Sequence, residues 1–481
     1  MVVPAVSSSS FLSTKYYPQW IATVAVLFTV LQMGAMCGWT SPYLARLTTP
    51  NDELWVTPAS ASWIAALLHV GRVAGTIVGL VCTNMWGSKR AMEHTLIVML
   101  LGWCLVLFAD SALILYFARS LSGMGIGMIF CCFPLYIGEI AFAEIRGAIF
   151  TLTFCGAPLG ILVACVTGFY LSLRHSAIVF IVPCVLNIAL FLWLPDSPHR
   201  LVRKGDLAGA KRAISWYRNG HGVDEELANV QKFIDSSSES GFLDFLRRLR
   251  VPYIRKAVFI SMMLFMYMQI SGLNSILFYM EIIFQKGQVT LLRPSLAVIL
   301  VSIAGVLAAV ASTNLMDKCG RRVLLIGSGS GVTLAMLMLG THFALLNYLG
   351  LAAAEHFQGL IIGGIFVFIV SFMLGLMPVP SAVLGELFAA DTKCQAAFVS
   401  SLVGAIFAFG SSKLYQPMVD GIGEAWVFFI HALLIITIVP FVLLFLPETK
   451  GKSLQEIQDI LNPGGVVKNN NDSSQASVDR F

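Results

Sequence analysis

Twelve apolar stretches, each long enough to cross a lipid bilayer, constrain this chain more than any other feature of its sequence. A helix needs about 20 predominantly apolar residues to span the hydrocarbon core. Charged residues make up only 12% of the sequence, whereas soluble domains carry about 25%. The sequence therefore predicts an all-α membrane protein with twelve transmembrane helices in two six-helix bundles. The predicted spans lie near residues 20–43, 62–83, 92–110, 112–137, 147–171, 176–195, 256–284, 295–316, 323–346, 358–386, 396–418 and 425–446.

One long polar segment, residues 195–256, separates the first six spans from the last six. It contains 12 Lys/Arg and 8 Asp/Glu, and Asp206 and Asp224 are the predicted N-caps of short surface helices within it. Two bundles joined in this way are typical of proteins whose halves rock around a central site. The predicted parts are an N-terminal segment (1–19), a first bundle (20–195), a connector (196–255), a second bundle (256–462) and a disordered tail (463–481).

Basic residues are distributed unevenly between the two sides of the predicted membrane. The side that holds both termini and the connector receives 24 of the 31 Lys/Arg and the opposite side receives 5, while Arg72 and Arg119 fall inside spans. Because Lys and Arg concentrate in cytoplasmic loops, both termini are predicted to be cytoplasmic in a multi-pass protein of the plasma membrane. The net charge of +5 follows from this bias, so no nucleic-acid partner is expected.

Cysteines and glycine-rich stretches give no indication of a cofactor, a metal site or an enzyme. None of the ten cysteines falls in a predicted extracellular loop, and their spacing does not match a metal site. The glycines at 123–127 and 327–331 do not follow a strand, so they are predicted to pack helices rather than to bind nucleotides. We find no nucleophile–base set and no phosphate loop in the sequence, and we therefore expect a membrane protein without catalytic activity.

The two halves of the chain repeat three landmarks in the same order. The residues 84–89 follow the second span as the residues 317–322 follow the eighth. An acidic and a basic residue seven positions apart follow the fourth and the tenth span, and Pro-Asp-Ser at 195–197 corresponds to Pro-Glu-Thr at 447–449. This repetition indicates duplication of a six-span unit.

These landmarks make the chain resemble the sugar porter family of the major facilitator superfamily, from about residue 20 to residue 461. The resemblance implies a facilitative transporter of trehalose, a hexose or a related polyol that works by alternating access. Thr40-Ser41-Pro42 and Gly71-Arg72 are most similar to the facilitated trehalose transporter-like proteins of insects. The matching motifs are Asp317-x-x-Gly320-Arg321-Arg322, Arg119 with Gly123 and Gly127, Pro134-x-Tyr136-x-x-Glu139-Ile140, Arg146-Gly147, Pro195-Asp196-Ser197-Pro198, Gln269-x-Ser271-Gly272-x-Asn274 and Pro447-Glu448-Thr449-Lys450-Gly451.

The seventh span carries polar side chains in an apolar helix, where unpaired amides are costly. Carboxamides combine donors and acceptors, which suits a neutral polyhydroxylated ligand, and a bend at Gly272 is predicted to turn the amides toward a cavity. The alternative is that these polar groups only join helices. The candidate binding residues are Gln269, Ser271 and Asn274, with Phe278 and Tyr279 for stacking on a sugar ring, and Trp39, Thr40 and Ser381.

Four positions depart from the pattern of the family. Met268 replaces a glutamine, Ser381 a tryptophan, Gly404 an asparagine and Phe154 a second glutamine. Because hydrogen-bonding and stacking groups are lost, two alternatives stay open. Besides the sugar transporter, these alternatives are a transporter of a non-sugar small solute and a non-transporting sugar sensor on the same fold.

Charged residues near the cytoplasmic ends of the helices form the predicted gate. The resemblance implies an ion-pair network that closes the inside of the outward-facing state, whereas ordinary solvated loop charges are the alternative. Asn84 and Ser88 make the first copy weaker than the second. The predicted gate residues are Asp317, Arg321, Arg322, Glu139, Arg146, Glu386, Lys393 and Glu448.

Arg72 is an intramembrane charge without an obvious acidic partner in the membrane interior. His69 lies three residues earlier, on the same face of the helix. Arg72 is predicted either to face the cavity and bind a ligand or a carbonyl group, or to make a packed helix contact.

Overall fold

A computed structural model describes residues 16–49, 54–142, 144–236, 242–350, 356–388, 390–452 and 454–461. Twelve stretches of helix in this part of the chain are long and apolar enough to cross a membrane, and each coincides with a predicted span. The prediction of an all-α membrane protein is therefore confirmed. The predicted tail at 463–481 and most of the N-terminal segment lie outside the described residues.

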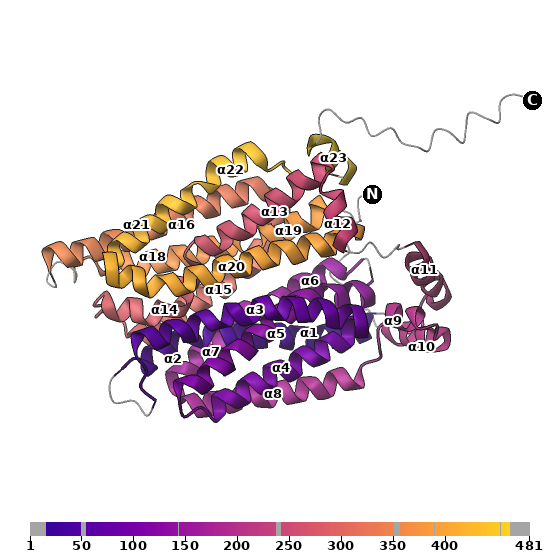
Figure 1. The fold of residues 1–481 in the computed structure, drawn as a ribbon, viewed down its shortest axis with the longest axis horizontal. Helices are drawn as coiled ribbons and strands as arrows, with labels where there is room; N and C mark the ends of the chain where they lie inside the picture. The colour runs from indigo at the N-terminus through magenta and orange to yellow at the C-terminus, as the bar shows by residue number, and fades with distance from the viewer. Residues whose placement is uncertain are drawn as a thin grey trace, which may run out of the picture.

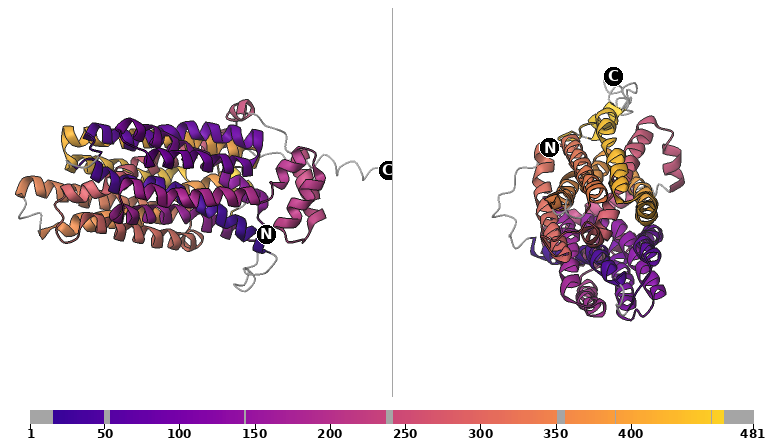
Figure 2. Two further views of the ribbon diagram at one scale, coloured as in Figure 1. Left: turned by 90° about the horizontal axis from the view of Figure 1, so that it is seen from below. Right: turned by 90° about the vertical axis from the view of Figure 1, so that its left-hand side faces the viewer.

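The helices fall into two halves that lie side by side (Figures 1 and 2). The first half contains α1 (Tyr17–Gly38), α2 (Thr40–Leu47), α3 (Pro58–Trp86), α4 (Ser88–Leu107), α5 (Ala112–Ile140), α6 (Arg146–Phe154), α7 (Gly156–Tyr170) and α8 (Leu173–Trp193). The second half contains α13 (Pro252–Ile270), α14 (Leu273–Lys286), α15 (Pro294–Cys319), α16 (Arg321–Leu349), α18 (Gln358–Ser371), the π-helix η2 (Phe372–Leu376), α19 (Val379–Leu387), α20 (Ala390–Ile422), α21 (Glu424–Ile436), α22 (Ile438–Phe445) and α23 (Leu454–Leu461).

Four short helices connect the halves, namely α9 (Pro198–Arg203), α10 (Leu207–Tyr217), α11 (Val223–Ser236) and α12 (Phe242–Arg248). Asp206 caps α10 as predicted, because its carboxylate accepts a hydrogen bond of 2.8 Å from the Gly209 amide. The prediction for Asp224 is wrong, since α11 already begins at Val223 and Asp224 lies in its first turn.

The connector marks one end of the molecule, which we call the inner end (Figure 1). The start of α1 lies there, because the Gln19 side chain donates to the carbonyl oxygen of Tyr217 in α10 at 3.2 Å. The end of α23 lies there as well, because Lys256 donates to the carbonyl oxygen of Leu461 at 3.0 Å. The opposite end, which carries α2 and α14, is called the outer end.

Glycines allow α3 and α5 to pack backbone against backbone. A Cβ atom added to Gly71 would lie 2.0 Å from the carbonyl oxygen of Ser120, and one added to Gly123 would lie 1.9 Å from that of Leu68. No side chain fits at such distances, so only glycine permits this approach. The prediction that the glycine stretch near residue 123 packs helices is confirmed.

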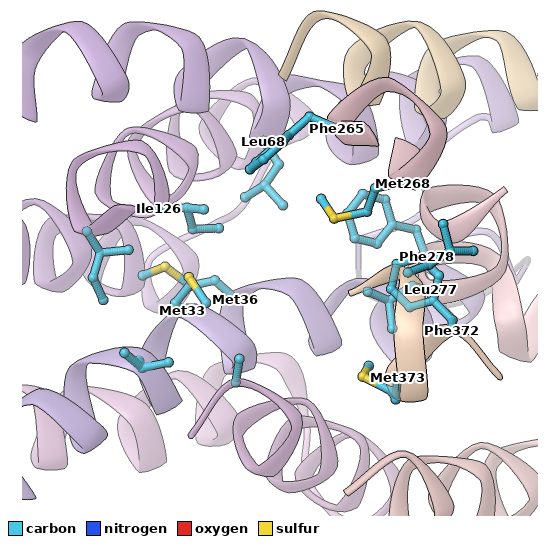
Figure 3. Close-up of a cluster of buried hydrophobic side chains, with 14 of the residues drawn as sticks. Met33, Met36, Leu68, Ile126, Phe265, Met268, Leu277, Phe278, Phe372 and Met373 are labelled. Atoms are coloured by element: carbon cyan, nitrogen blue, oxygen red, sulfur yellow. The ribbon is translucent and has the colours of Figure 1, made fainter. Parts of the chain in front are cut away.

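The seventh span is broken where the sequence predicts a bend. Gly272 has a φ of +86°, in the left-handed region that glycine adopts without strain, and it separates α13 from α14. The tenth span is also interrupted, because η2 and Pro378 lie between α18 and α19, and Pro380 lies in the first turn of α19. Met268, shortly before the first interruption, and Phe372 and Met373, within the second, lie on the side that faces the first half (Figure 3).

The two halves meet in the outer part of the molecule. The Ser41 hydroxyl on α2 accepts a hydrogen bond of 3.1 Å from the backbone amide of Glu281 on α14. The ammonium group of Lys413 on α20 lies 4.2 Å from the centre of the Trp63 ring on α3. These contacts join the halves on the side away from the connector.

Candidate functional site

The two predicted amides lie on either side of the helix break and bind each other. The Asn274 side chain donates a hydrogen bond of 3.0 Å to the Oε1 atom of Gln269. Both side chains are buried, with 1% of Gln269 and 3% of Asn274 exposed. Ser271 is buried too, and its hydroxyl donates to the carbonyl oxygen of Met268 at 2.8 Å. The break therefore brings the amides together and limits the cost of burying them.

Apolar side chains from both halves face each other around this break (Figure 3). The close-up shows Met33, Met36, Leu68 and Ile126 of the first half opposite Phe265, Met268, Leu277, Phe278, Phe372 and Met373 of the second. Phe265 also packs on Gly404. A Cβ atom added to Gly404 would lie 3.4 Å from the Cδ1 atom of Phe265. Met268 and Gly404, two of the positions that depart from the family pattern, thus contribute to an apolar layer between the halves.

The predicted stacking residues are engaged with other aromatic rings. Phe278 stacks on His69 of α3, with ring centroids 5.5 Å apart, and this contact connects the two halves. Tyr279 packs against Tyr415 of α20, with centroids 4.6 Å apart. Tyr415 belongs to none of the motifs named above, although a tyrosine inside an apolar span is a signal for a buried polar contact.

The remaining candidates are distributed around this centre. Trp39 and Thr40 lie at the junction of α1 and α2 and contact Arg119. Ser381 on α19 is exposed, and Phe154 at the end of α6 is partly buried. The structure therefore groups Gln269, Ser271, Asn274 and Phe278 at the helix break, whereas Trp39 and Thr40 belong to a separate cluster around Arg119.

Arg119 is a buried charge whose hydrogen bonds are satisfied within the first half. Its guanidinium donates to the carbonyl oxygens of Ile64 at 3.2 Å and Met36 at 2.7 Å, and to the Thr40 hydroxyl at 2.6 Å. The guanidinium also lies 5.3 Å from the centre of the Trp39 ring. Arg119 thereby ties α5 to α1, α2 and α3, which is a packing role.

The second-half gate residues form a cluster at the inner end. Arg321 forms an ion pair with Glu386 at 2.7 Å. The Glu448 carboxylate accepts hydrogen bonds from the backbone amides of Arg321 at 3.1 Å and Arg322 at 3.2 Å. Lys393 lies close enough to Glu386 for their charges to interact. Asp317 belongs to α15, but its side chain lies outside the described part of the structure.

The first-half copy of this cluster uses hydroxyl groups. Glu139 accepts hydrogen bonds from Ser88 and from Ser197, the latter at 2.6 Å. Arg146 donates to the carbonyl oxygen of Ala141 at 3.1 Å. The partners that the structure shows for both clusters lie within their own half or at its border with the connector. Assignment of these residues to a gate remains a prediction.

The hydrogen bonds to Glu448 predict a pH-dependent stability. Although burial raises the pKa of this carboxyl group, hydrogen bonds from the backbone amides of Arg321, Arg322 and Lys450 outweigh that effect and hold the pKa below its ordinary value. A lowered pKa stabilises the folded protein while the group is ionised, and the stabilisation is lost as the pH falls through the folded-state pKa.

We therefore expect the Glu448→Gln variant to melt below the wild-type protein at neutral pH, and the difference to shrink as the pH is lowered. Thermal unfolding in detergent at a series of pH values measures both melting temperatures. A difference that stays constant with pH would contradict the role assigned to the ionised carboxylate.

Known transporters are similar to this protein along almost the whole chain. The family model described as "Sugar (and other) transporter" matches residues 16–461. The "Facilitated trehalose transporter Tret1" of Apis mellifera ligustica is 28% identical over 453 residues, which cover 92% of this chain and 88% of that protein. The "Sugar transporter ERD6-like 6" of Arabidopsis thaliana is 28% identical over 437 residues, which cover 89% of this chain and 88% of that protein.

Solved structures with the same fold include the xylose transporter XylE from E. coli. Its inward open conformation superposes with a TM-score of 0.75 at 19% identity, covering 92% of this chain and 99% of that one. Its partially occluded inward open conformation gives a TM-score of 0.74 at 18% identity, covering 92% of this chain and 100% of that one. The twelve membrane spans, the repeated halves and the family match together show that this chain belongs to the sugar (and other) transporter family, with the major facilitator fold.

Proposed function

We propose that this protein is a facilitative transporter that carries a sugar, namely trehalose, a hexose or a related polyol, by alternating access. The observation that carries the proposal is the buried pair of Gln269 and Asn274 at the helix break between the halves. The names of the relatives described above support the same solute class.

The amide pair is suited to exchanging its own hydrogen bond for bonds to sugar hydroxyls. Each carboxamide has both donors and an acceptor. One neutral hydrogen bond contributes a net free energy of only about 0.5–1.5 kcal/mol. Breaking the bond between the two amides to admit a ligand therefore requires little free energy. The contacts in the outer part of the molecule, from Ser41 to Glu281 and from Lys413 to Trp63, then belong to the form that is closed on the outer side.

The orientation and the membrane are also part of this proposal. The inner end, which carries the connector, the start of α1 and α23, is proposed to face the cytoplasm, because 24 of the 31 Lys/Arg fall on that side. The plasma membrane is the proposed location. Transport rather than catalysis is the proposed activity.

Uptake of labelled trehalose, glucose and fructose into liposomes that contain the purified protein tests this function. We expect saturable uptake that ends when the internal and external concentrations are equal, and no such uptake into protein-free liposomes. If a sugar binds to the protein without entering the liposomes, the protein is a sensor. If no sugar binds or enters, the proposed solute class is wrong.

Transport is expected to be independent of a proton gradient. An intramembrane carboxylate is the usual proton carrier. The resemblance places that acid in the first span, where no Asp or Glu lies between residues 20 and 44. An uncoupler should therefore leave the initial rate and the final level of sugar uptake unchanged. Accumulation above the external concentration that collapses with the uncoupler would contradict this expectation.

A further inference from the structure

We propose that the transported solute carries an anionic group, and that Arg72 binds this group with His69 beside it. This inference rests on the proposed function, because it places the anion on the solute that moves between the halves. It adds acidic sugars, which carry a carboxylate besides their hydroxyl groups, to the neutral sugars of the proposed function.

The helix faces show that Arg72 points toward the region between the halves. Arg72 lies one helical turn after Leu68 on α3, and Phe130 lies one turn after Ile126 on α5. Figure 3 shows Leu68 and Ile126 directed toward the opposite half. Residues four positions apart share a helix face, so Arg72 and Phe130 face the same region. The Arg72 guanidinium lies 4.8 Å from the centre of the Phe130 ring.

The polar atoms of Arg72 and His69 lack the partners that Arg119 has. Within the described part of the chain, the guanidinium of Arg72 donates no hydrogen bond, and its Nε atom is fully buried. Both ring nitrogens of His69 are also buried without a hydrogen-bond partner there. Overall, 7% of Arg72 and 5% of His69 are exposed. Two adjacent polar side chains that are more than nine-tenths buried therefore have unused donors.

The charge of Arg72 has no acidic partner among the described residues. The groups near it are the thiols of Cys37 and Cys131 and the imidazole of His69, and the guanidinium of Arg119 adds a second positive charge near His69. Burying an unpaired charge is costly, and a ring contact such as that with Phe130 offsets only about 0.5–2 kcal/mol. A bound anion would supply the missing counter-charge and accept the free hydrogen bonds.

A continuous row of side chains connects this charge to the amide pair. His69 lies three residues before Arg72 on the same face of α3, Phe278 stacks on His69 at 5.5 Å, and Asn274 lies one turn before Phe278 on α14. A guanidinium binds a carboxylate or a phosphate through parallel hydrogen bonds, while carboxamides bind hydroxyl groups. The two ends of the row thus suit the two ends of a sugar acid.

Thermal unfolding and equilibrium binding with defined probes test this proposal. The probes are D-glucuronate, D-glucose and inorganic phosphate, and the proteins are wild type, Arg72→Gln, Arg72→Lys and the control Arg174→Gln. Arg174 is an exposed residue in the first turn of α8, at the outer end, so its replacement removes one positive charge away from the proposed site.

We expect wild type and Arg174→Gln to bind glucuronate roughly tenfold to a hundredfold more tightly than glucose, since a charged hydrogen bond strengthens binding by about that factor. Arg72→Gln should lose this preference while its affinity for glucose changes little, and Arg72→Lys should retain part of it. Phosphate should raise the melting temperature of wild type more than that of Arg72→Gln.

The outcomes separate this inference from the proposed function. If glucose is bound and carried but no anion distinguishes wild type from Arg72→Gln, the anion site is wrong and sugar transport stands. If no sugar is carried but phosphate or glucuronate stabilises wild type selectively, the anion site stands and the solute is not a sugar. If neither anion stabilises wild type more than Arg72→Gln, Arg72 is a packed helix contact and the inference is overturned.

Discussion

Replacing Gly123 by alanine is expected to disrupt the first half of the protein. The added Cβ atom would lie 1.9 Å from the carbonyl oxygen of Leu68, which belongs to the backbone of α3 and cannot rotate away. Helices α3 and α5 must then move apart where Gly123 meets Leu68. Overpacking of a core costs about 1–3 kcal/mol even when side chains adjust, so a backbone collision should lower the melting temperature by several degrees and reduce the monodisperse fraction after extraction.

Gly138→Ala on the same helix is the matched control. No atom lies within 4 Å of a Cβ atom added to Gly138, so this variant should melt at the wild-type temperature or above it, because alanine favours the helix. Size-exclusion chromatography and thermal unfolding of the two variants give the comparison. Equal behaviour of Gly123→Ala and Gly138→Ala would show that the close contact between α3 and α5 does not limit stability.

Removing either amide of the central pair should produce the largest loss of solute binding. In Gln269→Ala or Asn274→Ala, the remaining amide loses its 3.0 Å partner, and the ligand loses one donor or acceptor. An unsatisfied buried polar group costs about 1–3 kcal/mol, so each variant should bind the transported solute roughly tenfold or more weakly. Equilibrium binding of the labelled solute to purified protein measures the change.

The double variant Gln269→Leu/Asn274→Leu separates binding from folding, because it leaves neither an unpaired amide nor a large cavity behind. It should melt close to the wild-type temperature and still fail to bind, whereas the single variants lose both stability and affinity. Gln285→Ala provides the control, since Gln285 is an exposed glutamine on the same helix α14. Unchanged affinity in both single variants would place the solute elsewhere between the halves.

Alternating access requires different contacts at the two ends of the molecule. At the outer end, Ser41 and Glu281 join α2 to α14 through a hydrogen bond between the halves. At the inner end, the clusters around Glu139 and Glu386 have partners in their own halves or at the connector border. Rocking of the halves can therefore open the outer contact while both inner clusters stay intact.

The sequence by itself determined the twelve spans, the division into two halves and the break in the seventh span. Apolar length and charge distribution decide the spans, because the bilayer leaves few alternatives to a helix of about 20 residues. Gly272 determined the break, since its φ of +86° is strained for other residues. The motifs also placed Gln269 and Asn274 near the centre, because they lie two or three residues from that break.

Only the tertiary structure decided which of these polar groups have partners. Arg72 and Arg119 are both arginines inside apolar spans, and the sequence offers no difference in their charge. In the folded protein, carbonyl groups of α1 and α3 reach Arg119, whereas Arg72 meets the Phe130 ring. The difference depends on helices that are distant in sequence but adjacent in space. Local pattern determines helices, and packing between helices determines which buried charge meets hydrogen-bond acceptors and which meets a ring.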